Sequence, residues 1–360
     1  MSKIKILMVL GSLKYCNGIT SYALNYYKGL DKDRFEIDFA VHRSIETDYT
    51  KQILDSGSKI FYMGDFNIKS LLGVKKRIKK LLKENHYDII HCHILNIAYF
   101  YFSVAKKCNV KVRLLHSHAT KNSDNYLKNI RNSIFKRLAL KYSTHFWACS
   151  DLAGNYLFGN RNYKIIRNAI DYDKFYYSEE TRNELLEQLK ISKDTLILGF
   201  VGRFTNQKNI PFLIQISQAL KEKLFNFKMV MIGDGDLKEA IEKEISKKGL
   251  EDKIVILESR PDVNKYYSLF DIFLLPSFFE GLPVTGVEAQ VSGCPCLFSD
   301  AITKELDFTG NCKFLSINST NEWTEYISNF QKTRLQSIPL DFSLENETKV
   351  VENAYIELLN

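Results

Sequence analysis

The sequence of 360 residues is 45% hydrophobic and 26% charged and contains 6 prolines, so it predicts about two folded domains and excludes a mainly disordered chain. Its 7 cysteines include no C-x-x-C pair, which argues against a disulfide framework or a zinc site and favours a reduced cytosolic protein. Residues 1–180 carry 30 Lys and Arg against 16 Asp and Glu, whereas residues 181–360 carry 20 against 26. The basic half predicts an anionic partner, and because no nucleic-acid-binding motif is present, we expect a membrane surface and no nucleic acid.

The first half of the chain alternates β-rich runs with amphipathic helical patterns. Its apolar start, KIKILMVLG, is too short for a signal peptide and no small-residue cleavage site follows, so it predicts a buried first strand. No run approaches the roughly 20 apolar residues of a membrane-spanning helix. Further strands are expected at 35–42, 87–93, 110–118 and 144–150, and helices at 19–30, 69–84, 97–109 and 129–143. Such alternation is typical of a parallel sheet covered by helices on both faces.

The second half repeats this alternation after a polar, turn-rich stretch. A charged helix is expected at 181–190, and we place an interdomain linker at 171–194. Strands are then expected at 195–204, 227–235, 252–258, 272–277 and 294–300, helices at 209–224, 236–249, 263–270 and 281–293, and a last helix at 343–360. The fold class is therefore α/β, with Rossmann-like, doubly wound parallel-sheet domains at 1–170 and 195–340 and a C-terminal helix within 341–360.

The strongest motif is FFEGLPVTGVEAQVSGCP. Glu280 lies just before the start of a predicted helix, and Glu288 lies just over one turn inside it. Gly281, Leu282 and Pro283 follow Glu280 and lead into the helix. Free backbone N–H groups and the helix dipole at such a start favour a phosphate or a sugar oxygen. The carboxylate of Glu288 could accept hydrogen bonds from two ribose hydroxyls; the alternative is a surface helix with two ordinary glutamates.

A second motif, GFVGRFTNQKN, ends a strand at Gly202 and places Arg203 and Lys208 in the loop that follows. Open α/β sheets bind ligands at this end of their strands. Arg can hold a diphosphate bidentately and Lys adds a point charge, so the pair could neutralise a departing nucleoside diphosphate; the alternative is a solvated loop. In IGDGDL, Gly233 and Gly235 give a weak nucleotide-loop signal, and we assign the aspartates beside them to turn and N-cap roles rather than to a metal.

The first domain offers fewer candidates. Gly18, in the turn before the first helix, could bring backbone N–H groups against a diphosphate. His116 and His118 end the strand VKVRLLHSH, where we expect at least one of them to contact a ligand. His91 and His93 end another strand, and for these we favour packing or turn roles.

In this order and spacing, GRFTNQKN, IGDGDL, SRPDV and PSFFEGLPVTGVEAQVSGCP resemble the family-four retaining glycosyltransferases of GT-B fold, and in particular the bacterial capsule and exopolysaccharide transferases. The resemblance covers nearly the whole chain. NGITSYALNYYKGLD is similar to the family's glycine loop, although Thr20 stands where the family usually has Glu. That difference removes any role for a glutamate side chain in the loop, whereas the backbone contact at Gly18 is retained.

The resemblance implies roles for individual residues. Arg203 and Lys208 would hold the donor diphosphate and stabilise the leaving group, while Glu280 and His116 would contact the donor sugar. The residues that would bind the donor are Gly18, Gly202, Gly233, Gly235, Gly281, Leu282, Pro283, Glu288 and His118. The resemblance also implies that the two domains face a cleft and that the last helix crosses back to the first domain.

These observations predict a glycosyltransferase that moves a sugar, with retention at its anomeric carbon, from a UDP-sugar to a glycan or polyprenyl-linked acceptor in capsular or exopolysaccharide biosynthesis. No metal and no cofactor are expected, because Arg203 and Lys208 would neutralise the leaving group. Two alternatives remain open: a nonhydrolysing nucleotide-sugar epimerase and a non-enzymatic sugar-nucleotide-binding protein. A dinucleotide dehydrogenase is disfavoured, since no G-x-G-x-x-G follows Gly11.

Residues 69–83, KSLLGVKKRIKKLLK, carry seven basic and no acidic side chains. Their apolar residues recur at helical spacing, so we expect one face to pack on the sheet and the lysine face to meet anionic lipid at the inner face of the plasma membrane. The alternative is a lysine face that is merely solvated.

Overall fold

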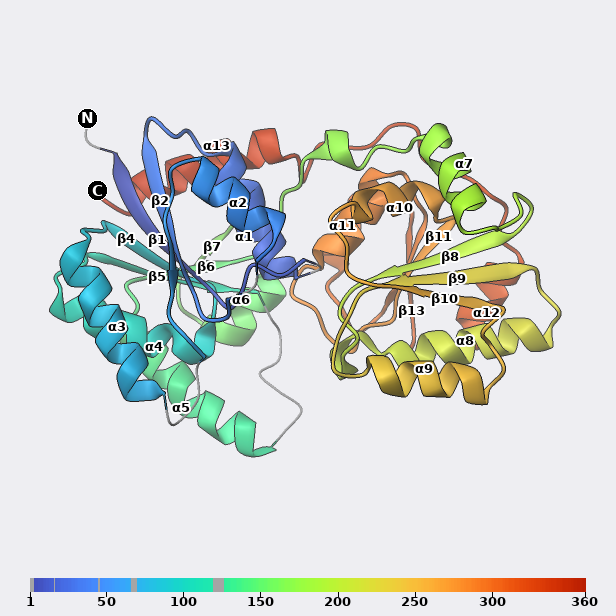
Figure 1. The fold of residues 1–360 in the computed structure, drawn as a ribbon, viewed down its shortest axis with the longest axis horizontal. Coiled ribbons are helices and arrows are strands. Elements are labelled where there is room, and N and C mark those ends of the chain that lie inside the picture. Colours follow the sequence, from blue (N-terminus) through green and yellow to red (C-terminus); the bar gives the residue numbers. More distant parts are fainter. Residues whose placement is uncertain (1–2, 16, 45, 66–69, 119–125) are drawn as a thin grey trace. The chain divides into compact units, whose positions relative to one another are not determined.

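The computed structural model describes residues 3–15, 17–44, 46–65, 70–118 and 126–360, and the chain forms two compact units (Figure 1). Unit 1 comprises Met1–Tyr15, Ile19–Ala169 and Leu344–Asn360, and unit 2 comprises Cys16–Gly18 and Ile170–Ser343. Each unit is built on a parallel sheet with helices on both faces, which confirms the predicted fold class.

The sheet of unit 1 has seven strands in the order β3-β2-β1-β4-β5-β6-β7, and its neighbouring strands are parallel. The strands are β1 (Ile4–Leu10), β2 (Phe35–Val41), β3 (Ile60–Tyr62), β4 (Ile89–Cys92), β5 (Val112–Ser117), β6 (His145–Ala148) and β7 (Lys164–Ile165). The helices are α1 (Gly18–Gly29), α2 (Asp48–Asp55), α3 (Leu71–Glu84), α4 (Leu95–Lys107), α5 (Tyr126–Tyr142), α6 (Asp151–Phe158) and α13 (Leu344–Glu357). The strand order reverses between β1 and β4, as in a doubly wound fold.

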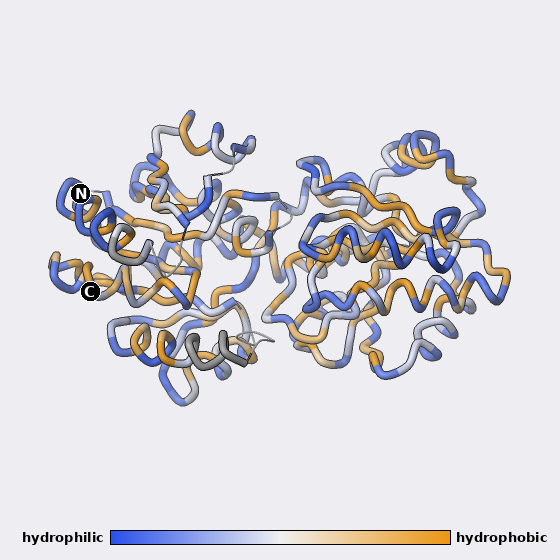
Figure 2. Tube along the Cα trace, turned by 60° about the horizontal axis from the view of Figure 1, so that its bottom comes forward, coloured by the Kyte–Doolittle hydropathy of each residue, from blue (hydrophilic) through white to orange (hydrophobic). Residues whose placement is uncertain are grey.

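Two hydrophobic cores fill unit 1, one on each face of its sheet. Side chains alternate across β1, so that Ile6 and Met8 join the core beneath α1, α2 and α13, whereas Leu7 and Val9 join the core beneath α3, α4, α5 and α6. Figure 2 shows hydrophobic residues along the strands and hydrophilic residues on the outward turns of the helices. The strands are buried on both faces, which explains why their sequences read as continuous apolar runs.

Unit 2 has six strands in the order β10-β9-β8-β11-β12-β13, and its neighbouring strands are also parallel. The strands are β8 (Leu196–Val201), β9 (Phe227–Ile232), β10 (Ile254–Leu257), β11 (Ile272–Leu275), β12 (Cys296–Ser299) and β13 (Cys312–Leu315). The helices are α7 (Glu179–Gln188), α8 (Ile210–Glu222), α9 (Lys238–Lys247), α10 (Val263–Leu269), α11 (Val284–Val291), α12 (Asn321–Ser328) and the short 3-10 helices η1 (Tyr172–Lys174), η2 (Asn206–Lys208) and η3 (Lys304–Leu306). The α7, α10 and α11 helices lie on one face of the sheet and α8, α9 and α12 on the other (Figure 1).

The segment 171–194, expected to be a linker, belongs to unit 2 instead. Its helix α7 packs against α10, where Arg182 donates a hydrogen bond of 2.8 Å to the carboxylate of Asp271 and Leu185 is buried. Although this segment is mostly polar, the buried side chain of Leu185 and the ion pair of Arg182 hold it against the rest of unit 2. This stretch of the unit therefore extends over 170–343 rather than 195–340.

Candidate active site

The two strongest motifs of the sequence meet at one edge of the sheet in unit 2. Strand order there reverses between the neighbours β8 and β11, and ligands of doubly wound sheets bind outside the carboxyl ends of the strands at such a point. The β8 strand ends at Val201 and is followed by Gly202 and Arg203, while β11 ends at Leu275 and residues 276–283 lead into α11. The fold therefore places the predicted diphosphate loop beside the predicted sugar loop.

Lys208 and Glu280 form an ion pair between these two loops. Lys208 Nζ lies 2.6 Å from Glu280 Oε1, and the two side chains are only 13% and 10% exposed. The side-chain amide of Gln207 donates to Glu280 Oε2 at 3.2 Å and to the carbonyl of Phe279 at 2.9 Å. The predicted leaving-group lysine and the predicted sugar-facing glutamate are thus direct neighbours, and each offsets the charge of the other.

Arg203 differs from Lys208 in its surroundings. Its side chain is exposed, and within the described ranges no ion pair involves it. Its backbone carbonyl accepts a hydrogen bond from the Thr205 N–H, which shapes the turn before η2. The guanidinium is therefore a solvent-accessible cation at the ligand edge of the sheet, available to a bidentate anion.

The predicted glycines allow the loops after β8 and β9 to approach each other closely. A Cβ atom on Gly233 would lie 1.9 Å from the carbonyl oxygen of Gly202, and one on Gly235 would lie 2.4 Å from the carbonyl oxygen of Phe204. The Asp234 carboxylate accepts a hydrogen bond from the Gly235 N–H at 2.8 Å, so it has a turn role. The absence of side chains at these glycines thus permits the backbone conformation of the loop that carries Arg203.

Glu288 lies within α11 and is 8% exposed. The hydroxyl of Tyr267 donates a hydrogen bond to its Oε2 at 2.5 Å. Burial raises the pKa of the Glu288 carboxyl to about 7, and the hydrogen bond from Tyr267 acts in the opposite direction. At neutral pH this carboxyl is therefore balanced between its charged and neutral forms.

The start of α11 is largely enclosed. Gly281, Leu282 and Pro283 are buried, and among the described residues Pro283, at the N-cap position, makes no side-chain capping hydrogen bond. Thr285, in its first turn, has a buried hydroxyl without a hydrogen-bond partner in the part of the chain that the structure describes. Sequence reasoning did not identify Thr285, Tyr267 or Gln207, because none of them is marked by a strand end or a paired charge.

Four histidines gather at the carboxyl ends of β4 and β5 in unit 1. His91 Nδ1 is hydrogen-bonded to the Tyr355 hydroxyl at 2.7 Å, and its Nε2 to His116 Nδ1 at 3.1 Å. His93 Nδ1 is hydrogen-bonded to His118 Nε2 at 2.9 Å. Burial lowers the pKa of all four rings, so they are neutral at pH 7. The fold thus joins the two predicted ligand histidines to the two for which packing was expected.

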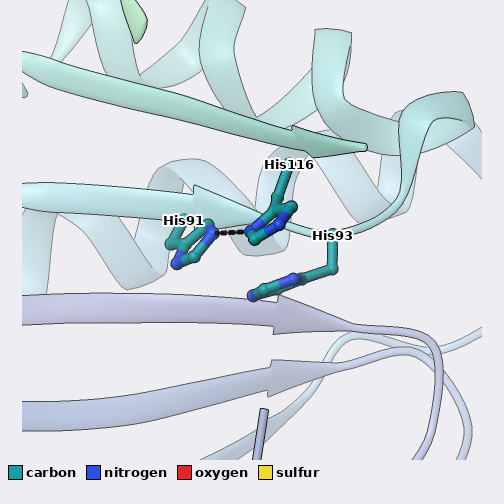
Figure 3. A group of neighbouring side chains, drawn as sticks. All are labelled: His91, His93 and His116. Atoms are coloured by element: carbon teal, nitrogen blue, oxygen red, sulfur yellow. Dashed lines mark hydrogen bonds between the residues drawn. The ribbon is translucent and has the colours of Figure 1, made fainter. Parts of the chain in front are cut away.

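His91, His93 and His116 point toward one another (Figure 3) and offer ring nitrogens within 4.8 Å of each other, close enough to be considered as a metal site. Both nitrogens of His91 already have partners, however, and the three neutral rings bring no negative charge to offset a cation. We therefore interpret the group as a hydrogen-bonded stack. The Nε2 atoms of His93 and His116 are buried without a partner among the described residues, so a polar ligand could satisfy them.

The remaining predicted features of the first half of the chain lie elsewhere. Gly18, predicted in the first domain, is the first residue of α1 and groups with unit 2. In α3, Val74 and Ile78 are fully buried, while the side chains of Lys76 and Lys80 are exposed, as expected for a helix that packs by its apolar face; Lys69 lies outside the described residues. Within the described ranges, no helix combines the length and the apolar character that crossing a membrane would require.

Comparison with known proteins gives two family matches and close relatives. Residues 16–174 match the model of "Glycosyltransferase Family 4", and residues 181–327 match that of "Glycosyl transferases group 1". The chain is 32% identical over 314 residues to a Bacillus subtilis (strain 168) protein named as the glycosyltransferase EpsF, covering 85% of this chain and 82% of that protein. It is 25% identical to the Escherichia coli UDP-Gal:alpha-D-GlcNAc-diphosphoundecaprenol alpha-1,3-galactosyltransferase, covering 83% and 80%.

Among solved structures, Anabaena HepE in complex with UDP-glucose superposes with a TM-score of 0.83 over 98% of this chain and 100% of that one, at 17% identity. At this identity the likeness concerns the fold. The superposition shows that the two parallel-sheet units form the GT-B fold. The two family matches and the extended match to EpsF show that the chain belongs to the glycosyltransferases of group 1 and family 4.

Proposed function

We propose that this glycosyltransferase transfers a sugar from a UDP-sugar to a glycan or polyprenyl-linked acceptor in capsular or exopolysaccharide biosynthesis, with retention at the anomeric carbon. The observation that carries the proposal is the group at the ligand edge of unit 2. There an exposed arginine and a largely buried Lys–Glu pair lie on adjoining loops, and a buried carboxylate lies in the helix that follows one of these loops. Cations suit a diphosphate, and a carboxylate suits ribose hydroxyls.

In this proposal Arg203 binds the diphosphate first, because its guanidinium is accessible. Lys208 adds its charge as the leaving group departs, and Glu280, its partner at 2.6 Å, orients it and meets the donor sugar. The main catalytic effect is electrostatic stabilisation of the leaving diphosphate. Glu288 accepts the ribose hydroxyls, and the backbone around Gly281, together with Gly202, Gly233 and Gly235, lets the donor approach the loops closely.

Residues from the first half of the chain would supply the remaining contacts. We propose that Nε2 of His116, which has no partner among the described residues, forms a hydrogen bond with the sugar. His118 would lie beside it, and Gly18 would contact the phosphates. Histidine stays neutral there because burial lowers its pKa. A neutral ring suits a sugar hydroxyl better than a buried cation would.

The acceptor proposal draws on the Escherichia coli relative, whose name specifies a diphosphoundecaprenol-linked acceptor and an α-1,3 product. Such a lipid carrier would place the enzyme at the cytoplasmic face of a membrane, and the exposed lysines of α3 would hold it there. Transfer from an α-linked nucleotide sugar to an α-linked product is retention, which supports the proposed stereochemistry.

The first test is a panel of nucleotide sugars incubated without acceptor and assayed for slow hydrolysis, because many transferases hydrolyse their donor. We expect UDP release from one UDP-sugar, and about a hundredfold less from Arg203→Ala. Lys223→Ala is the matched control, since Lys223 is an exposed cation at the end of α8, away from the β8 loop. A new sugar isomer instead of hydrolysis would identify an epimerase, and binding without any turnover would identify a non-enzymatic binding protein.

The proposed use of two cations in place of a metal gives a second test. Transfer should survive EDTA, because Arg203 and Lys208 neutralise the leaving group themselves. Complete loss of transfer on chelation, with recovery on adding magnesium or manganese, would contradict this part of the proposal.

A further inference from the structure

A buried tyrosine outside both motifs contacts the carboxylate proposed to bind the ribose. Tyr267 comes from α10 and is fully buried. Its ring packs against those of Phe175, Phe270 and Phe273, with centroids 5.7, 5.8 and 5.9 Å away. Its hydroxyl donates to Glu288 Oε2 at 2.5 Å. An aromatic cage thus aims one hydrogen-bond donor at one oxygen of the carboxylate.

The backbone of Tyr267 is held as firmly as its ring. Arg334 donates to the carbonyl of Tyr267 at 3.3 Å and to that of Ser292, just after α11, at 2.6 Å. The Ser292 hydroxyl also donates to the Tyr267 carbonyl, at 3.4 Å. One guanidinium therefore ties α10 to the end of α11, so the distance between the phenol and Glu288 is fixed from both sides.

Glu288 needs such a partner because its carboxyl is almost excluded from water, where a charge is costly. The α10, β11 and β12 elements pack against α11. Of these, α10 brings Tyr267, together with Lys265 and Tyr266, while β11 has no titratable side chain and β12 brings Cys296. Tyr267 is the one of these groups that contributes to the pKa of Glu288, and it lowers that pKa against the effect of burial.

We propose that Tyr267 is a positioning residue for the nucleotide: its hydroxyl holds the Glu288 carboxylate in one orientation and stabilises its negative charge, so that the carboxylate accepts the ribose hydroxyls. This inference rests on the proposed donor site. It assigns to α10 a part in nucleotide binding that neither motif indicates. It also makes donor affinity dependent on pH near neutrality, since the charged carboxylate is the stronger acceptor.

The test measures binding of UDP-glucose between pH 6 and 8.5 by calorimetry. Its diphosphate is a diester and does not titrate in this range. In the wild type, affinity should rise with pH through about 7, where the Glu288 carboxyl ionises. Tyr267→Phe removes the donor that lowers this pKa, so affinity at pH 7 should fall about tenfold and the midpoint should move to higher pH.

Tyr266→Phe is the matched control. Tyr266 is the neighbouring, equally buried tyrosine, and its hydroxyl has no hydrogen-bond partner among the residues that the structure describes. It should leave both the affinity and the midpoint unchanged. A second readout uses 2′-deoxy-UDP-glucose: the wild type should bind it more weakly than UDP-glucose, and Tyr267→Phe should lose most of that discrimination.

The outcomes separate this inference from the proposed function. If the wild type binds UDP-glucose but Tyr267→Phe keeps the wild-type midpoint and the wild-type discrimination, Tyr267 does not position Glu288. If the wild type does not bind UDP-glucose, the proposed donor and this inference both fall. Should Tyr267→Phe fail to fold, Glu288→Gln replaces it: its amide retains the shape without the charge, so the pH dependence must disappear, and persistence of that dependence would overturn the proposal.

Discussion

Lys208 and Glu280 form an ion pair that is largely buried. Their side chains are 13% and 10% exposed and their charged atoms lie 2.6 Å apart. Taking two charges out of water costs free energy that is recovered only with good geometry and additional hydrogen bonds, and Gln207 supplies one of these to Glu280. Removing one partner leaves the other as an uncompensated buried charge. A single substitution is therefore expected to disturb stability as well as the proposed catalysis.

The two effects can be separated by removing the pair as a unit. Lys208→Met and Glu280→Gln should each lower the free energy of unfolding by about 3 kcal/mol, because each strands one charge. The double variant should recover most of that loss while its turnover stays roughly a hundredfold below wild type. Urea unfolding and initial rates of donor hydrolysis measure the two quantities. A double variant that turns over like the wild type would show that Lys208 has no part in the chemistry.

At the scale of the elements, the buried parallel strands and the edge strand β10 were predictable, whereas the edge strands β3, β7 and β13 were not. The β1, β8 and β9 strands are continuous apolar runs, since helices cover them on both faces. The edge strands β3 and β7 have three and two residues and contain no fully buried position, and β13 has one exposed and three half-buried positions. Their apolar pattern is too short and too weak to be told from a loop.

For the site as well, residues marked by a local sequence pattern were predictable, whereas contacts that depend on tertiary packing were not. Arg203 and Lys208 were predicted as site residues because they follow a strand, and Glu280 because it precedes a helix. Their closeness depends on β8 and β11 being neighbours, although two other strands of the sheet lie between them in sequence. No local pattern encodes that order. The contact of Tyr267 with Glu288 is likewise a product of how α10 and α11 pack.

The glycines of the β8 and β9 loops give a prediction at this scale. Gly233→Ala would place a Cβ atom 1.9 Å from the Gly202 carbonyl oxygen, so the two loops must separate. We expect a loss of about 3 kcal/mol in the free energy of unfolding. Donor binding should also weaken, because Arg203 lies in the loop that is displaced. Thermal unfolding and UDP-glucose binding measure these effects.

Gly73→Ala serves as the control, because Gly73 lies in helix α3 with only an ordinary contact at 3.5 Å. Alanine favours a helix over glycine by about 1 kcal/mol, so this variant should be slightly more stable than the wild type. Equal effects of the two substitutions would contradict the close approach of the loops.

At the scale of the whole molecule, the positive charge is concentrated in residues 1–180. The α3 helix buries its apolar side chains in unit 1 and leaves Lys76, Lys79 and Lys80 exposed. Its lysine face is therefore free to meet an anionic surface without any loss of packing. At about 1 kcal/mol for each basic residue near such a surface, three or four residues would suffice for the proposed recruitment.

We expect the protein to pellet with anionic lipid vesicles at low salt and to be released at high salt, since screening weakens such contacts. Changing Lys75, Lys76, Lys79 and Lys80 to Glu should abolish pelleting. The control carries the same change in charge at exposed positions of unit 2, Lys193, Lys223, Lys243 and Lys247 to Glu, and should still pellet. If both variants behave alike, net charge and not α3 governs the binding.

Unit 1 is assembled from stretches that lie on either side of unit 2 in the chain. Val351, Ala354 and Tyr355 of α13 complete one of its cores, and Tyr355 supplies the hydroxyl that bonds His91. During translation, residues 19–169 therefore emerge without part of their core, whereas Ile170–Ser343 is complete before α13 is made. Nascent domains generally fold in the order of their synthesis, but here the later unit should fold first, and His91 should form its hydrogen bond to Tyr355 only after the ribosome has passed residue 355.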